Sequence, residues 1–111
     1  MNALARKFES LRSKGQIEDR DVAELLGADP EVVAKWDQGS EFPPVASEKS
    51  LLEIEYIVDL LADFYQPSEA REWLFSPQTL LDGAKPADLI RRGDLDGVLR
   101  LVGQLREGAY L

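Results

Sequence analysis

Apolar residues recur along the chain at intervals of three and four, the spacing of an α-helix that packs one face on a core. Glycines and prolines separate these apolar segments, and strand-like alternation is almost absent. The pattern therefore predicts an all-α fold. The first three expected helices end at Gly15, Gly27 and Gly39. The third begins at Asp29-Pro30, a capping side chain followed by proline at the first helical position.

Two adjacent prolines make residues 40–46 a predicted non-helical boundary, because each proline lacks a backbone donor. Ser47 is expected to cap a long helix that Pro67 ends, and Ser68 to cap the next. The apolar residues of the long helix cover much of its circumference. We therefore expect it to be buried on more than one side, or to form a dimer surface.

The last third of the chain is divided by proline and glycine into short helical segments. Ser76-Pro77 is expected to start a turn, Pro86 to start a helix that ends at Gly93, and a last helix to end at Gly108. Asp94 and Asp96 are expected to cap that last helix. The predicted organisation is a first domain over residues 1–46, a connecting helix over 47–66 and a C-terminal domain over 67–111.

Composition narrows the possible functions. The 111 residues are 44% hydrophobic, enough for a core, and carry a net charge of −8. This sign argues against sequence-independent nucleic-acid binding and favours a basic partner or simple solubility. The absence of cysteine and histidine excludes disulfides, Cys/His zinc sites and histidine acid–base catalysis. No apolar run approaches the roughly 20 residues of a membrane span. We expect a cytoplasmic protein without a cofactor.

The segment IEDRDVAELLGADPEVVAKWDQG, residues 17–39, resembles the helix-turn-helix of Xre-like repressors. Ala23 falls where the two helices cross and Gly27 falls in the turn. The resemblance makes Arg20, Pro30, Glu31 and Lys35 candidate DNA-binding residues. Two carboxylates, those of Asp29 and Glu31, would face the phosphates, which is repulsive. A helix-turn-helix kept as a scaffold and one that binds an operator both remain open.

A second set of residues resembles the C-terminal toxin-binding domain of the Xre/MbcA/ParS antitoxins. The order of the parts is also similar to the MbcA type of this family: a helix-turn-helix, a long helix and then this module. The residues that carry the resemblance are Trp73-Leu74-Phe75-Ser76-Pro77, Leu80-Leu81, Lys85-Pro86-Ala87-Asp88-Leu89-Ile90, Gly93, Val98-Leu99 and Glu107-Gly108.

The resemblance implies a definite function. Antitoxins of this family pair with RES-domain toxins, which consume NAD, and hold them inactive, and the C-terminal end reaches toward the NAD cleft of the toxin. Many members also repress their own operon. The chain would then be no enzyme. Its partners would be a RES-domain toxin and, in some members, operator DNA, in a homodimer or a larger toxin–antitoxin hetero-oligomer.

The residues of the C-terminal end suit that role and form the predicted toxin-binding site: Leu105, Gly108, Ala109, Tyr110 and Leu111. A terminal carboxylate can be captured by a pocket, a flat tyrosine ring fits a slot shaped for a base, and glycine lets the chain leave the helix. Alternatively, the end is frayed or folds back onto the core. The competing function is a DNA-binding repressor whose second half serves only for dimerisation.

Overall fold

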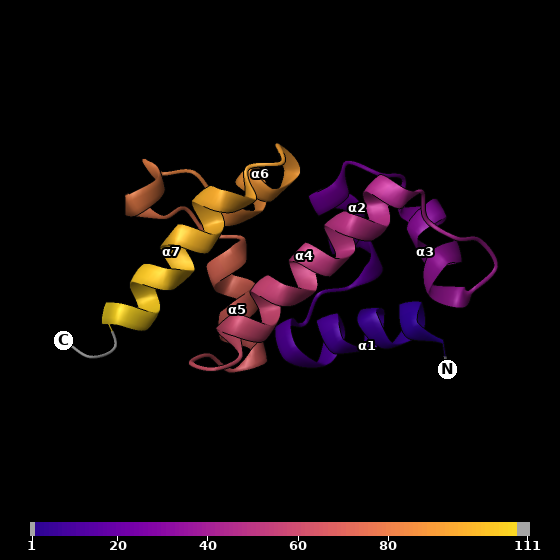
Figure 1. Ribbon diagram of the computed structural model, residues 1–111, viewed down its shortest axis with the longest axis horizontal. Coiled ribbons are helices and arrows are strands. Elements are labelled where there is room, and N and C mark those ends of the chain that lie inside the picture. Colours follow the sequence, from indigo (N-terminus) through magenta and orange to yellow (C-terminus); the bar gives the residue numbers. More distant parts are fainter. Residues whose placement is uncertain (1, 109–111) are drawn as a thin grey trace.

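The computed structural model describes residues 2–108, and all regular elements in that range are helices. The predicted all-α fold is therefore confirmed. Helices α1 to α3 gather at one end of the elongated molecule and α5 to α7 at the other, with α4 running between them (Figure 1). The elements are α1 (Ala3–Gly15), α2 (Asp19–Leu26), α3 (Pro30–Gln38), α4 (Val45–Leu61), α5 (Pro67–Leu74), the 3-10 helix η1 (Thr79–Leu81), α6 (Pro86–Arg91) and α7 (Leu95–Gly108).

Helices α2 and α3 end where the local sequence predicts, and α3 also begins where it predicts. Gly27 and Gly39 follow them in the left-handed conformation, with φ of 66° and 81°. Asp29 accepts a hydrogen bond of 2.8 Å from the backbone N–H of Glu31 at the start of α3. Such a cap stabilises a helix by about 1 kcal/mol. Ala23 is buried in α2, which contacts α3, as expected for a crossing point.

Helix α4 starts earlier than predicted. It begins at Val45, directly after Pro44, so Ser47 lies inside the first turn and is not its cap. The non-helical segment is therefore shorter than residues 40–46, because the restriction imposed by proline ends at Pro44. The helix ends at Leu61, well before Pro67. Its contacts with α1, α2 and α7 confirm burial on more than one side.

The predictions that Pro67 ends the long helix and that Ser68 caps the next one are both wrong. Pro67 begins α5, at its first position, and Ser68 follows inside it. The cap is Gln66, whose backbone N–H donates to the Glu69 side chain at 2.9 Å. Proline needs no partner for a backbone N–H at this position, so it favours starting a helix. The turn predicted to start at Ser76-Pro77 begins slightly later, because the 3-10 helix η1 starts at Thr79.

One hydrophobic core runs through both ends of the molecule, from Phe8 in α1 to Val102 in α7. Helix α1 contacts α4 and α5, and α2 contacts α6. Arg71 of α5 adds a polar link, because its guanidinium binds the buried carboxylate of Asp21 in α2. The predicted division at residues 46 and 66 stays a prediction, and the segments on either side of it pack as one body.

Candidate partner-binding surface

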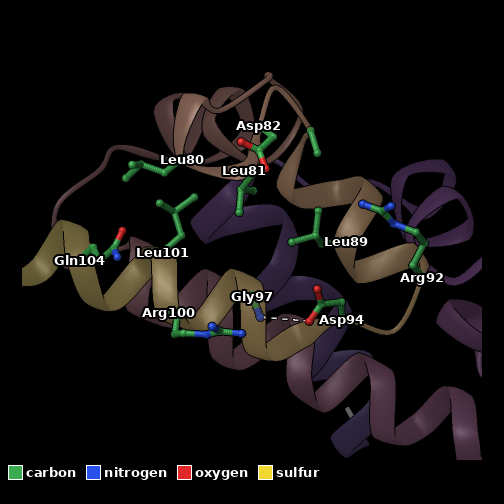
Figure 2. A pocket seen from close by; sticks show the side chains of 11 residues that line it. Leu80, Leu81, Asp82, Leu89, Arg92, Asp94, Gly97, Arg100, Leu101 and Gln104 are labelled. Carbon is green, nitrogen blue, oxygen red and sulfur yellow. Dashed lines mark hydrogen bonds between the residues drawn. The ribbon is translucent and has the colours of Figure 1, made fainter.

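A groove of about 510 Å³ lies between the loop over residues 78–84 and helices α6 and α7. Figure 2 shows Leu80 and Leu81 reaching from the loop toward Leu101 of α7, with Leu89 of α6 beside them. Leu80 is 69% exposed, although its side chain is large and apolar. The groove is lined by Leu80, Leu81, Asp82, Ala84, Leu89, Arg92, Asp94, Gly97, Arg100, Leu101 and Gln104.

The loop that forms one wall is closed by its own backbone. The N–H of Gln78 donates to the carbonyl of Ala84 at 3.0 Å, and the N–H of Gly83 donates to the carbonyl of Gln78 at 2.9 Å. The chain reverses at Asp82 and Gly83, both left-handed, with φ of 57° and 86°. Glycine adopts this conformation without a steric cost. The closed loop holds its leucines over α7.

The other wall is the corner between α6 and α7. Gly93 turns the chain with φ of 82°, and Asp94 accepts a hydrogen bond of 3.2 Å from the N–H of Gly97. The predicted cap at Asp94 is thus confirmed, while Asp96 lies in the first turn of α7. A Cβ at Gly97 would lie 2.9 Å from Leu89 Cδ2. Glycine therefore allows α6 and α7 to approach closely here.

The groove carries cations in a chain that is otherwise acidic. Residues 85–108 hold five Lys/Arg and four Asp/Glu, against eight and seventeen in residues 1–84, so the excess negative charge lies outside the last two helices. Arg92 and Arg100 line the groove and are exposed. Neither is in an ion pair with another residue of the range 2–108.

The predicted toxin-binding residues are only partly described. Leu105 is half-buried and packs against the core, so much of its surface already has a structural role. Gly108 is exposed and is the last residue of α7. Ala109, Tyr110 and Leu111 lie outside the described residues. Gln104 and Leu101, on the same helix, line the groove.

The candidate DNA-binding residues lie on α2 and α3, apart from the groove. Arg20, Pro30 and Glu31 are exposed, and Glu31 is in the first turn of α3. Lys35 is exposed too, with its Nζ 3.7 Å from a carboxylate oxygen of Glu41. The candidate surface thus has one of its two cations next to a carboxylate.

Neighbouring cations are also bound to carboxylates. Arg12 Nη1 donates to Asp37 at 2.7 Å and lies 3.6 Å from Asp19, and Lys14 binds Asp59 at 2.7 Å. Burial and the neighbouring Asp37 raise the pKa of Asp19 to about 6, although Arg12 opposes this. The ion pairs with Asp37 and Asp59 link α1 to α3 and α4, and they leave fewer cations for phosphates.

Leu80, Arg92 and Arg100 are the candidate site residues that sequence reasoning missed. Leu80 entered the sequence analysis only as one of the residues that carry the family resemblance. A usable signal was present in the sequence: the last two helices are close to neutral inside a chain of net charge −8. The meeting of these three residues at one groove depends on how the loop, α6 and α7 pack.

Within residues 2–108 no three Asp or Glu side chains converge as metal ligands would. None of the helices formed by these residues combines the length and the apolar character needed to cross a membrane.

Comparison with known proteins agrees with this architecture. Residues 60–108, which include the groove, match the family described as the antitoxin Xre/MbcA/ParS C-terminal toxin-binding domain. The chain is 32% identical over 111 residues to the mycobacterial cidal antitoxin MbcA of Mycobacterium tuberculosis, and the alignment covers 100% of this chain and 98% of that protein. The chain belongs to the Xre/MbcA/ParS family of antitoxins.

Two further comparisons support the membership in this antitoxin family. A probable mycobacterial cidal antitoxin of M. tuberculosis is 29% identical over 91 residues, which are 82% of this chain and 77% of that protein. The fold matches a chain in the crystal structure of the M. tuberculosis MbcT–MbcA toxin–antitoxin complex, with a TM-score of 0.84, 32% identity and full coverage of both chains. Antitoxins are regulatory proteins, and this family member is not an enzyme.

Proposed function

We propose that this antitoxin neutralises a RES-domain toxin that degrades NAD, and that it does so by direct binding. The full-length similarity to MbcA, together with the fold match to a chain of the MbcT–MbcA toxin–antitoxin complex, carries the proposal. The toxin class comes from the family resemblance. The module of residues 60–108 would provide the binding surface, since it matches the toxin-binding domain of the family.

We further propose that the residues from Gly108 onward block the NAD cleft. An NAD site must hold a pyrophosphate and two flat ring systems, so it offers cations and narrow slots. Tyr110 has a flat ring with a polar tip that suits such a slot. Helix α7 would act as the rigid support of this segment, because Val98, Leu101 and Val102 are buried in the core.

Loss of NAD in a mixture of toxin and antitoxin tests this mechanism. The toxin in this mixture is a RES-domain protein of the proposed class. Deletion of residues 109–111, or Tyr110→Ala, is expected to restore NAD consumption, while Phe42→Ala, an exposed aromatic residue in the N-terminal half, leaves inhibition unchanged. Full protection of NAD by the deletion variant would reject occlusion by this segment. Failure of the intact chain to bind the toxin would reject the function itself.

A second candidate function is repression of its own operon through DNA binding. The observation that favours it is the pair α2 and α3, joined across the left-handed Gly27 and started by the Asp29 cap. A mobility-shift assay on the upstream DNA, with and without the toxin, tests it. A shift that needs residues of α3 supports repression, and no shift under either condition rejects it.

We also propose that the antitoxin forms a homodimer or a larger assembly with the toxin. Leu52 and Tyr56 of α4 are 49% and 56% exposed and line a small apolar groove with Leu95 and Leu99 of α7. Burial of such a surface would favour association. Sedimentation of the wild-type chain and of Leu52→Gln is expected to give a dimer and a monomer, respectively. The proposal would be contradicted if the wild-type antitoxin is a monomer by itself and also forms a complex of one antitoxin with one toxin.

A further inference from the structure

The groove in the C-terminal module combines an apolar floor with two uncommitted cations (Figure 2). Leu81, Leu89 and Leu101 form the floor, and Leu80 overhangs it from the loop. Leu89 and Leu101 are held in place because they are buried on their other sides. A partner that covers Leu80 would remove a large apolar side chain from water, which favours binding.

The charges of the groove indicate the sign of the partner. Arg92 and Arg100 form no ion pair within residues 2–108, and they are the two cations that line the groove. Arginine binds a carboxylate through two parallel N–H donors, which gives direction as well as attraction.

Two carboxylates, those of Asp82 and Asp94, also line the groove, and that of Asp94 is already engaged. It accepts the N–H of Gly97 and so occupies the anion position at the start of α7. A phosphate at this position would compete with the Asp94 carboxylate for that N–H. Together with the leucine floor, this favours a peptide segment over a small anionic ligand.

The charge of the rest of the chain restricts the partner further. Residues 1–84 hold seventeen Asp/Glu against eight Lys/Arg, so an acidic protein surface is repelled over most of the molecule. An acidic segment of the partner finds a favourable position where Arg92 and Arg100 lie. Its carboxylates must then be confined to a short stretch flanked by apolar side chains.

We propose that this groove binds a segment of the partner toxin that carries both apolar side chains and a carboxylate, with the apolar side chains on the leucine floor and the carboxylate at Arg92 or Arg100. The inference rests on the proposed function, because the partner is the toxin. The groove would be a second contact with the toxin, separate from the contact proposed for the segment after Gly108.

The affinity of the antitoxin for a RES-domain toxin of the proposed class tests the proposal. Arg92→Gln combined with Arg100→Gln is expected to weaken binding at least about tenfold and to reduce its dependence on salt. The matched control is Arg20→Gln combined with Arg91→Gln, which removes two exposed arginines that do not line the groove and lie outside the segment from Leu105 onward. Circular dichroism and thermal unfolding confirm that all variants fold.

Comparison of the groove double variant with the control double variant distinguishes the possible outcomes. Equal weakening in both double variants would mean a general charge effect and would overturn the proposal. Binding of the groove variant as tight as wild type would also overturn it and would leave the proposed function standing. A wild-type chain that does not bind the toxin at all would overturn both.

A photo-cross-linking experiment tests the chemistry of the segment. Leu80 replaced by p-benzoylphenylalanine is expected to capture a toxin peptide that contains Asp or Glu next to apolar residues. The same replacement at Phe42, an exposed residue of the N-terminal half, is expected to capture a different peptide or none. A peptide from position 80 without a carboxylate would overturn the proposal.

Discussion

The guanidinium of Arg71 in α5 donates hydrogen bonds to both carboxylate oxygens of Asp21 in α2, at 2.6 Å and 3.0 Å. Arg71 also donates to the carbonyl of Gln16 at 2.8 Å and lies 5.1 Å from the ring centre of Phe75. Asp21 is 4% exposed and is the buried charged residue of the core. Burial raises its pKa, but the bonds from Arg71 and from the Glu18 N–H outweigh this, and the pKa lies below 3.8.

Replacing Arg71 by methionine should destabilise the fold, because it leaves the Asp21 carboxylate buried without its partner. We expect a loss of about 2–3 kcal/mol, since removing one member of a buried pair costs about 3–5 kcal/mol and Arg71 is partly exposed. Chemical denaturation measures the change. Arg91→Met, at an exposed arginine, is the control and should change stability little.

The double variant Arg71→Met with Asp21→Asn should recover part of that loss, because it removes the second charge as well. The variant Asp21→Asn keeps an acceptor for the N–H of Glu18, which donates to Asp21 at 2.8 Å. A double variant no more stable than Arg71→Met alone would contradict the role assigned to the buried charge.

Asp19 should make the fold less stable as the pH rises from about 4 to about 6. The folded state keeps a proton on this carboxyl up to about pH 6, and the unfolded chain releases it near the ordinary value of 3.8. The stabilising contribution is thus full below pH 3.8 and lost through pH 6. Asp19→Asn should therefore be more stable than wild type at pH 7, by about 1 kcal/mol after allowance for solvent screening.

Denaturation of Asp19→Asn and wild type at pH 4 and pH 7 gives the measurement for Asp19. The gain should disappear at pH 4. Glu24→Gln, at an exposed carboxylate of the same helix, serves as the control and should show no such difference. An Asp19→Asn gain that is equal at both pH values would contradict the assigned cause.

Gly103→Ala should stabilise α7 by about 0.5–1 kcal/mol, because alanine loses less backbone entropy than glycine in a helix. A Cβ at Gly103 meets no heavy atom within 4 Å. The same substitution at Gly97 in the same helix is the matched comparison, since that Cβ would lie 2.9 Å from Leu89 Cδ2. Thermal unfolding should rank Gly103→Ala above Gly97→Ala, and the reverse order would contradict this account of the α6–α7 contact.

DNA binding by the wild-type chain should be weak, and Glu31→Lys should strengthen it several-fold. Glu31 is exposed in the first turn of α3, where a helix-turn-helix would approach the duplex. The change replaces a charge repelled by phosphates with one attracted to them. Mobility shifts at two salt concentrations measure it, with Glu72→Lys on α5 as a control of equal charge change. Equal gains in both variants would mean that only net charge matters.

Local sequence was a good guide to the helix boundaries where caps are formed by near neighbours. Asp29 with Pro30, Gly39 and Gly93 have the predicted positions and conformations. The errors are local too, because Ser47 and Ser68 lie inside the helices that Pro44 and Gln66 precede. A serine near a helix start is a weaker signal than the proline beside it, which already sets the backbone angle.

The sequence by itself determined the all-α class, most of the helix boundaries and the family, because these depend on periodicity, on contacts within about four residues and on a spaced motif. Tertiary structure alone decided which distant residues meet. The packing of the helices places Arg71 on Asp21 and buries Asp19 near Asp37, which raises the pKa of Asp19. The same packing places Leu80 at a groove lined by Arg92 and Arg100. These relationships depend on how finished helices pack, and no local pattern in the chain contains that information.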